Sequence, residues 1–324
     1  MAACRQSPAR NDYMSDLVYN PELSSAAGWR ALPPEYAIPD RAPSLEEAQK
    51  YCARLAHSHY ENFSVVTWFL PKHLHQHFYN IYAYCRISDD LGDEVGDKQQ
   101  SLLLLDEWEA ELKQCYSGAP RHPVFVALRD TVREFNIPQH EFADLLIAFR
   151  QDQTITRFPT FDDVLGYCHY SANPVGHLVL YLCGYRDAQR QQLSDNTCTA
   201  LQLANFWQDV AVDYEKGRIY LPLDSMAKFG VSESDIANRD ATPQFRALLK
   251  FEVQRARDWF QRGLPLAKMV DRSLALDIEL FSRGGMAILD AIERQDYDVL
   301  TRRPVISKPR KLWLVARAAL GNLL

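Results

Sequence analysis

Two groups of acidic residues have types and a spacing that could serve chemistry. In the first group, Asp89 and Asp93 are four residues apart, so on a helix they project from one face about one turn from each other. Like charges at this spacing repel, and acids at the carboxyl end of a helix also oppose its dipole. A solvated acidic helix end fits poorly here, because the flanking Ile87 and Leu91 have the character of buried residues. We therefore treat this pair as a candidate site.

The second group repeats the spacing at Asn205, Asp209 and Asp213. With Gln202, these residues form one polar stripe on a predicted helix whose other faces are apolar, which indicates a stripe that points inward or into a cleft. Two carboxylate pairs that face each other would offer a cage of hard oxygen ligands, which suits Mg²⁺ bridging a diphosphate better than zinc. The predicted metal ligands are Asp89, Asp93, Asp209 and Asp213.

The composition restricts the class of protein that carries these acids. The 324 residues include 36 Lys plus Arg and 42 Asp plus Glu, a net charge of −6, with 47% hydrophobic residues, as in a folded globular protein. The negative charge argues against a nucleic-acid partner. No apolar stretch is long enough to span a bilayer, and we identify no signal peptide, so we expect a cytoplasmic protein. The seven cysteines lack Cys-x-x-Cys spacing, which favours reduced thiols over a structural zinc site.

Helical periodicity positions both acidic groups. Ser44 and Glu47 have the spacing of a capping box, and helical sequence patterns continue from there to the carboxyl-terminal region. Amphipathic patterns and start signals predict helices over 74–89, 102–116, 141–149, 160–168, 194–212, 242–260 and 273–292. Alternating strand patterns are absent, so we expect a single all-α domain over 44–324. Residues 1–43, rich in Pro, Ser and Ala, are expected to form a tail or an arm.

The motifs around these acids resemble those of the squalene and phytoene synthase family. The resemblance covers roughly residues 45–310. The segments that carry it are 82–94, 167–176, 202–213, 216–222 and 297–302. It implies an all-α isoprenoid synthase fold with a central cavity between helices, in which facing Asp-x-x-x-Asp motifs bind Mg²⁺ and the diphosphate of a prenyl diphosphate substrate.

The resemblance also implies roles for individual residues. The four aspartates would hold Mg²⁺ directly or through water. The residues implied to bind the diphosphate are Arg86, Gln202, Asn205, Arg218 and Arg302. The residues implied to take part in catalysis are Tyr82, Arg86, Tyr167 and Asn173, with Tyr167 and Asn173 as candidates for positioning a water molecule. These residue types suit the chemistry, because cations stabilise a departing diphosphate and aromatic faces stabilise the carbocation left behind.

Departures from the family pattern indicate one branch of it. Gln208 stands where most similar head-to-head prenyl synthases have Arg, and 172–174 reads Ala-Asn-Pro in place of the usual Ala-Gly. With 59–63 and 70–71, these features are similar to the bacterial hydroxysqualene synthases of hopanoid pathways. The resemblance implies that presqualene diphosphate ionises, rearranges and is captured by water to give hydroxysqualene. No NADPH is then expected.

Other reactions on the same scaffold stay open. One alternative condenses two farnesyl diphosphates to presqualene diphosphate or squalene, and another condenses two geranylgeranyl diphosphates to phytoene. A third interpretation is a non-catalytic assembly factor with the same fold, but the presence of all four aspartates argues against it.

Two further patterns bear on partners and metals. Segment 302–317 holds six bases, no acid and an apolar run, which fits peripheral contact with an anionic inner membrane, although a solvated helix explains it equally. Enzymes of the same pathway are further candidate partners. Of His73, His75 and His77, only the first and last share a helix face, and the sequence shows no further ligands for a metal. We therefore expect surface or pocket-rim histidines.

Overall fold

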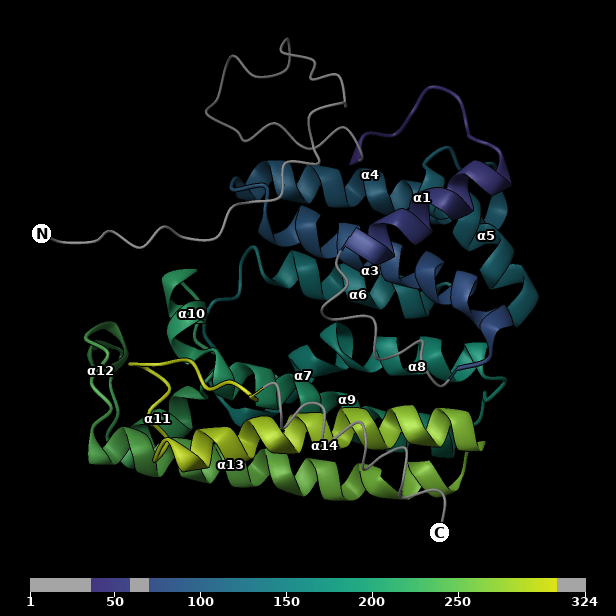
Figure 1. Ribbon diagram of the computed structural model, residues 1–324. Helices are drawn as coiled ribbons and strands as arrows, with labels where there is room; N and C mark the ends of the chain where they lie inside the picture. The colour runs from purple at the N-terminus through teal and green to yellow at the C-terminus, as the bar shows by residue number, and fades with distance from the viewer. Residues whose placement is uncertain (1–35, 59–69, 308–324) are drawn as a thin grey trace, which may run out of the picture.

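The computed structural model describes residues 36–58 and 70–307, and most of these residues are helical (Figure 1). The bounds of the helices are α1 (Leu45–Ser58), η3 (Lys72–Leu74), α3 (His75–Asp93), α4 (Lys98–Ser117), α5 (Pro123–Phe135), α6 (His140–Gln151), α7 (Phe161–Ser171), α8 (Asn173–Leu182), α9 (Ala188–Gln208), α10 (Val210–Glu215), α11 (Leu223–Phe229), α12 (Glu233–Ala237), α13 (Pro243–Gly263), η4 (Leu264–Lys268) and α14 (Arg272–Arg294). Within the described ranges the one strand-like pairing is an isolated bridge between Arg157 and Ile219, so the all-α, single-domain prediction is confirmed.

The helices pack around two hydrophobic clusters. The first cluster is built by α1, α3, α4, α5, α6 and α8, and Tyr84 and Trp108 are among its largest fully buried side chains. The second is built mainly by α7, α9, α11, α13 and α14, around Trp207, Phe245 and Phe260. Figure 1 shows α1, α3, α4, α5 and α6 above α9, α13 and α14, with α7 of the second group and α8 of the first group between them. Helices α3 and α9, which carry the two acidic motifs, therefore belong to different halves of the molecule.

Local capping signals fix several helix starts where the sequence predicts them. The Ser44 hydroxyl accepts a hydrogen bond from the Glu47 N–H, and the Glu47 carboxylate accepts one from the Ser44 N–H. Thr160 and Asp163 form the same capping box at α7, and Thr242 caps α13. Helix α9 begins at Ala188, six residues before the predicted start at residue 194, because the Asp187 side chain caps it.

The predicted helix 194–212 is interrupted at the second acidic motif. Helix α9 ends at Gln208, and Asp209 adopts φ −109° and ψ 15° before α10 begins. The backbone hydrogen bonds from Asp209 to Asn205 and from Asp213 to Asp209 are kept, at 2.9 and 2.8 Å. The bend is thus a local change of dihedral angles, at a point where acids four residues apart repel and where Asp209 pairs with Arg303. The prediction of one continuous helix over 194–212 is therefore wrong, although the motif keeps its helical hydrogen bonding.

The amino-terminal arm is described only in part. Residues 1–35 of the predicted arm lie outside the described residues, as do residues 59–69 and 308–324. From residues 36–43, the Tyr36 hydroxyl donates to the Asp90 carboxylate at 2.6 Å, so this part of the arm lies on α3. None of the described helices is both long and apolar enough to cross a membrane.

Candidate active site

The first acidic motif lies at the carboxyl end of α3. Arg86 pairs there with Asp90, which is 4% exposed, and lies 3.5 Å from the Asp89 carboxylate. Asp90 also accepts the hydrogen bond from Tyr36, so it serves as the buried partner of Arg86. Arg86, which is predicted to bind the diphosphate, is thereby held beside the motif by Asp90, an acid that is not one of the predicted metal ligands.

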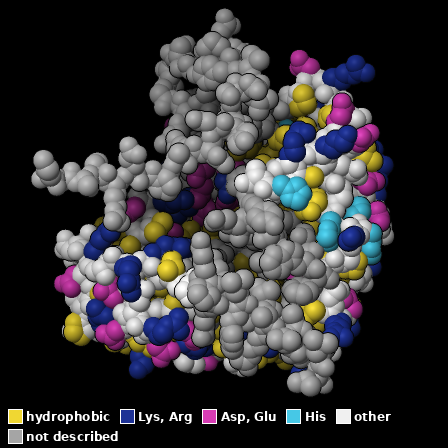
Figure 2. Space-filling view, viewed as in Figure 1, with side chains coloured by type: hydrophobic (Ala, Val, Ile, Leu, Met, Phe, Trp, Pro, Cys, Tyr) yellow, Lys and Arg dark blue, Asp and Glu magenta, His cyan; other side chains and the backbone are white. Residues whose placement is uncertain are grey.

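Basic residues from the second motif reach across to the first. The loop after α10 carries Arg218 and Lys216, whose side chains contact the Asp93 carboxylate at 2.8 and 3.2 Å. Burial alone would raise the pKa of Asp93, but the hydrogen bond and charge of Arg218, with those of Lys216, hold it below its usual value. In the space-filling view, acidic and basic side chains meet in a hollow of this face (Figure 2). The loop after the second motif therefore lies against the first motif.

The remaining carboxylates indicate that the site can take a cation. Burial and the charge of Asp93 raise the pKa of Asp89 to about 6, and burial and the charge of Asp209 raise the pKa of Asp213 to about 7. Burial first and repulsion by a neighbouring acid second thus disfavour the charged form of both carboxylates, and the nearby bases do not fully offset this. Because the donors are carboxylate oxygens, the residues fit a hard divalent cation.

Arg303 completes the second motif. Its guanidinium contacts both oxygens of Asp209, at 2.5 and 2.9 Å. Arg302, which the sequence favoured, is exposed, and its carbonyl accepts a hydrogen bond from Gln295. Of these two adjacent arginines, Arg303 is the one that pairs with Asp209. The sequence showed two adjacent arginines but gave no sign of which one faces the site.

Tyr167 is a buried residue that contacts Asp152, a neighbour of the first acidic motif. Its hydroxyl donates to Asp152 at 3.0 Å, and its ring packs near Phe206 and Tyr220. Burial raises the pKa of Asp152 to about 7, although Arg218 acts in the opposite direction. Sequence reasoning missed Asp152, because it is a lone acid without a spaced partner. The Asp152 carboxylate accepts a hydrogen bond from Tyr167, and its backbone carbonyl accepts one from Arg218.

The other predicted residues occupy different depths. Asn173 is buried at the start of α8 and accepts a hydrogen bond from the Thr199 hydroxyl at 3.1 Å. Gln202 is partly buried and Asn205 is exposed, on the same stretch of α9 as the second motif. Neither Tyr167 nor Asn173 lines the cavity described next.

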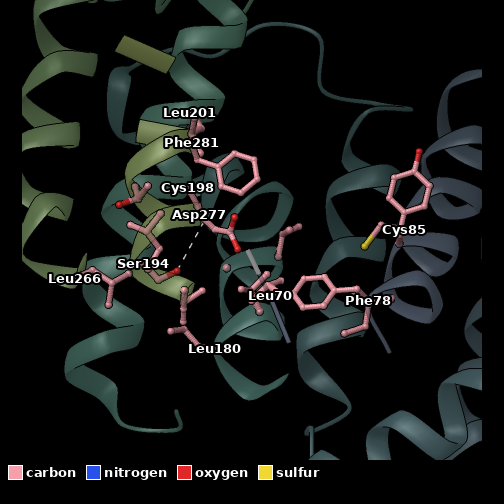
Figure 3. Close-up of a pocket in the computed structure, with 18 residues that line it drawn as sticks. Leu70, Phe78, Cys85, Leu180, Ser194, Cys198, Leu201, Leu266, Asp277 and Phe281 are labelled. Atoms are coloured by element: carbon pink, nitrogen blue, oxygen red, sulfur yellow. Dashed lines mark hydrogen bonds between the residues drawn. The ribbon is translucent and has the colours of Figure 1, made fainter. Parts of the chain in front are cut away.

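An apolar cavity of about 260 Å³ lies between α3, α8, α9 and α14 (Figure 3). Tyr82 and Cys85 line it from α3, and Cys85 lies one helical turn before Asp89. Leu201 lines it from α9, one turn before Asn205. The cavity thus begins directly beneath the acidic motifs. This confirms the predicted cavity between helices and places Tyr82 on its wall.

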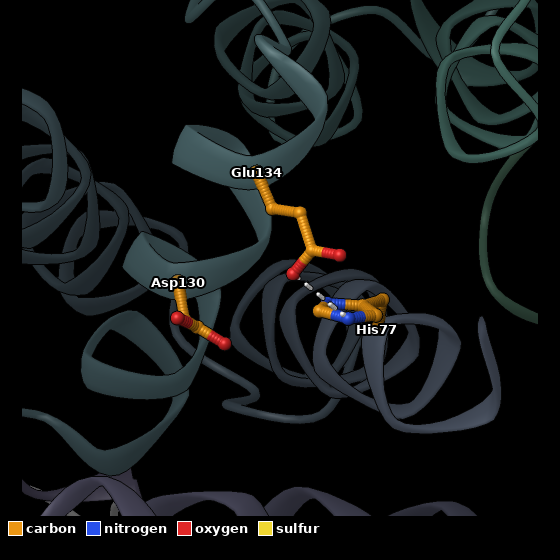
Figure 4. A group of neighbouring side chains, drawn as sticks. All are labelled: His77, Asp130 and Glu134. Atoms are coloured by element: carbon orange, nitrogen blue, oxygen red, sulfur yellow. Dashed lines mark ion pairs between the residues drawn. The ribbon is translucent and has the colours of Figure 1, made fainter. Parts of the chain in front are cut away.

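A second group of side chains can hold a metal ion. Within the described part of the chain, one group of three such side chains has its ligand atoms within 4.8 Å of one another: His77, Asp130 and Glu134 (Figure 4). The aspartates of the two motifs do not come this close together, so the predicted cage of carboxylates is not formed. His77 Nε2 lies 3.4 Å from Glu134, and Nδ1 is hydrogen-bonded with Thr131 at 3.1 Å. His77 is 8% exposed, so the expectation of a surface or rim histidine is wrong for it. The sequence alone did not show that Asp130 and Glu134 of α5 lie beside His77, because they are distant from it in the chain.

Helices that enclose an apolar cavity beneath paired aspartates are the architecture of all-α isoprenoid synthases. The model of the squalene/phytoene synthase family matches residues 56–310. The chain belongs to the squalene/phytoene synthase family.

Individual relatives differ in the product that their names state. The structure of squalene synthase HpnC from Alicyclobacillus acidocaldarius superposes with a TM-score of 0.75 at 45% identity, over 78% of this chain and 95% of that one. A dehydrosqualene synthase superposes with a TM-score of 0.78 at 25% identity, over 86% and 98%. Phytoene synthase 2 of Solanum lycopersicum is 32% identical over 86% of this chain and 92% of its own, and the 15-cis-phytoene synthase of Synechococcus elongatus is 30% identical over 85% and 94%.

Proposed function

We propose that this chain is a magnesium-dependent hydroxysqualene synthase that acts on presqualene diphosphate. The observation that carries the proposal is an apolar cavity that starts one helical turn beneath two aspartate motifs flanked by arginines. The 45% identity to a squalene synthase structure, against 30–32% to phytoene synthases, supports a C30 product over a C40 product. The departures at Gln208 and 172–174 support the hydroxysqualene branch.

The polar residues at the cavity mouth would bind and ionise the substrate. Asp89, Asp93, Asp209 and Asp213 would hold Mg²⁺, which is usually bound by a few carboxylates together with substrate phosphate oxygens. The bound metal would neutralise charge on the departing diphosphate. Basic side chains that already contact these aspartates would donate hydrogen bonds to the diphosphate oxygens: Arg86, Lys216, Arg218 and Arg303. Gln202, Asn205 and Arg302, which lie nearby in the chain, would add further donors.

The cavity would control what happens to the cation. Its apolar wall excludes bulk water, and ring faces such as those of Tyr82, Phe78 and Phe281 can stabilise positive charge. Because the diphosphate leaves with its electron pair and water then adds, the reaction consumes no reductant. We therefore propose that NADPH is not required.

The decisive experiment is product analysis with purified protein and Mg²⁺. Presqualene, farnesyl and geranylgeranyl diphosphates are each incubated with and without NADPH, and products are identified by mass spectrometry. Hydroxysqualene from presqualene diphosphate alone supports the proposal. NADPH-dependent squalene or phytoene contradicts it. Glu134→Gln, which removes a ligand of the His77 group, is the control for metal binding away from the cavity.

A second candidate function is phytoene synthesis from geranylgeranyl diphosphate. The named relatives at 30–32% identity, whose full lengths this chain largely covers, are phytoene synthases. The same experiment separates the two, because hydroxysqualene forms from presqualene diphosphate, whereas phytoene forms from geranylgeranyl diphosphate.

The partners follow from the substrate and its product. We propose a prenyl diphosphate as the ligand, no nucleic acid, and contact of 302–317 with a membrane surface or with enzymes that supply and use these lipids. Residues 302–307 are described, and Arg303 among them faces Asp209. Sedimentation with anionic vesicles, compared between the full chain and one truncated after residue 307, tests the membrane contact.

A further inference from the structure

Asp277 is a buried carboxyl group without a hydrogen-bond partner. It lies on α14, is 3% exposed, and neither of its oxygens has a partner among the described residues. It is one of the residues that line the apolar cavity, and its carboxyl group points into the space that the lining side chains surround (Figure 3). A buried polar group without a partner destabilises the protein, so its presence requires an explanation.

The serine and threonine hydroxyl groups in the cavity wall are directed elsewhere. The Ser194 hydroxyl lies 3.9 Å from the Cys198 sulfur, and the Thr197 hydroxyl donates to the Leu193 carbonyl at 3.4 Å. The remaining wall near Asp277 is apolar, with Leu274 and Phe281 on its own helix. Because no group in the described part of the chain pairs with this carboxyl group, a molecule inside the cavity is the remaining candidate partner.

The proton affinity of this group suits an acid–base role. Burial, followed by the charge of Asp271, raises the pKa of Asp277 to about 8. A group with a pKa near the working pH both accepts and releases a proton readily. A carbocation in the cavity would in addition favour the charged carboxylate.

The proposed reaction needs a water molecule in a cavity that otherwise repels water. The two residues that the sequence offered for this role are engaged elsewhere: Tyr167 donates to Asp152, and Asn173 accepts from Thr199. On the premise of the proposed function, we infer that Asp277 binds the capturing water within the cavity and accepts its proton.

The step balances without any redox partner. The carbon–oxygen bond of presqualene diphosphate breaks, and its electron pair leaves with the diphosphate. The rearranged cation then forms a bond with a lone pair of the water held by Asp277. One O–H bond of that water breaks, its electrons stay on the oxygen, and the proton moves to the carboxylate. The products are an alcohol, diphosphate and one proton, which Asp277 later returns to solvent.

The test separates ionisation from capture in the full-length protein. Asp277→Leu and Asp277→Asn are incubated with presqualene diphosphate and Mg²⁺, and diphosphate release and product identity are measured in the same reaction. Glu279→Gln is the matched control, because it removes a charge from the same helix at a side chain that pairs with Arg283. Wild-type protein in H₂¹⁸O should place ¹⁸O in the alcohol.

We expect Asp277→Leu to keep diphosphate release within about threefold of wild type while the hydroxysqualene fraction falls about tenfold or more. Hydrocarbons formed by proton loss should replace the alcohol. Asp277→Asn keeps a water-binding oxygen but cannot take the proton, so its alcohol fraction should lie between the two. Glu279→Gln should match wild type.

Two results would overturn the inference. An unchanged alcohol fraction in Asp277→Leu shows that another group directs the water. Equal loss of diphosphate release and alcohol, with a lowered melting temperature, shows a structural role, since removal of an unpartnered buried carboxyl should raise that temperature. Failure of the proposed function is distinct from both, because wild-type protein would then form no hydroxysqualene at all.

Discussion

The charges at the cavity mouth are unevenly neutralised. Asp93 and Asp209 each contact a basic side chain at 2.9 Å or less, whereas the pKa values of Asp89 and Asp213 are raised to about 6 and 7. A site of this kind is costly in the absence of its ligand, because the folded chain holds repelling carboxylates close together. The uneven neutralisation leads to two expectations for single substitutions.

Asp89→Asn and Asp209→Asn should each lower turnover of presqualene diphosphate by about 100-fold or more, because each removes a carboxylate proposed to hold the metal. Circular dichroism and melting temperature should show an intact fold. Turnover equal to that of wild type in either variant would contradict the metal assignment. Glu279→Gln serves as the control for loss of an acid elsewhere.

Asp213→Asn should stabilise the protein while it impairs turnover. The pKa of Asp213 lies above its ordinary value, so its ionised form is disfavoured in the folded state at pH 8, and a neutral amide removes that penalty. We expect a melting temperature higher by about 2 °C or more in EDTA. A lower melting temperature would show that the Asp213 carboxylate has a stabilising partner instead.

At the scale of elements, His177 joins three helices. From α8, its ring nitrogens lie 2.9 Å from Glu141 on α6 and 2.7 Å from Asp195 on α9. Burial by itself would lower the pKa of His177, but hydrogen bonds and charge from Asp195 and Glu141 raise it to about 9. The protonated ring therefore ties α8, a wall of the cavity, to helices of both halves.

The stability that His177 supplies should decline at high pH. Because its folded pKa lies above the unfolded value of about 6.5, the contribution is complete below pH 6.5 and is lost as pH rises through about 9. At full strength it is of the order of 3 kcal/mol. The melting temperatures of wild type and His177→Gln, measured from pH 6 to pH 10, should converge above pH 9. A constant difference would exclude a charged His177.

The segment 301–307 is held in place by two glutamine side chains. Gln208 donates to the Pro304 carbonyl at 2.6 Å, and Gln295 donates to the Arg302 carbonyl at 2.9 Å. These contacts flank Arg303 and hold it on Asp209. Gln208, which the sequence marked only as a departure from its relatives, thus has a structural role.

Gln208→Ala and Arg303→Ala should each raise the KM for presqualene diphosphate about 5- to 10-fold, through loss of one guanidinium contact. Because Gln208 acts by positioning Arg303, the double variant should be no worse than Arg303→Ala alone. Multiplication of the two effects would show that Gln208 acts independently. Steady-state kinetics of the four proteins make the comparison.

Local signals were readable in the sequence, and long-range ones were not. The capping boxes at Ser44 and Thr160 and the four-residue acidic spacing depend on neighbours in the chain, so they were predicted. The positions of Arg303 and Asp152 depend on contacts between distant segments, which one sequence does not show. Asp277 was missed for a further reason: an acid beside Glu279 in an amphipathic helix reads as part of its polar face.

At the scale of the whole molecule, the cavity lies between two separately packed halves. Helix α3 is anchored in the first hydrophobic cluster and α9 in the second, and bases on the second half hold Asp93 of the first. Substrate binding at the motifs would therefore bridge both halves. The net charge of −6 includes the acids of both motifs, which lie together at this junction.

The apolar wall of the cavity also has a consequence for the rate of successive turnovers. Once diphosphate leaves, the product keeps no charged group for the basic side chains to bind, yet its hydrocarbon still fits the wall described for the substrate. We expect a rapid first turnover followed by a slower steady rate, set by escape of the product. Lipid vesicles should accelerate the steady rate and leave the first turnover unchanged, in rapid-quench measurements. A rate without a burst would place the slow step at ionisation. The same wall that protects the cation from water thus makes a nearby lipid phase the natural exit for the product.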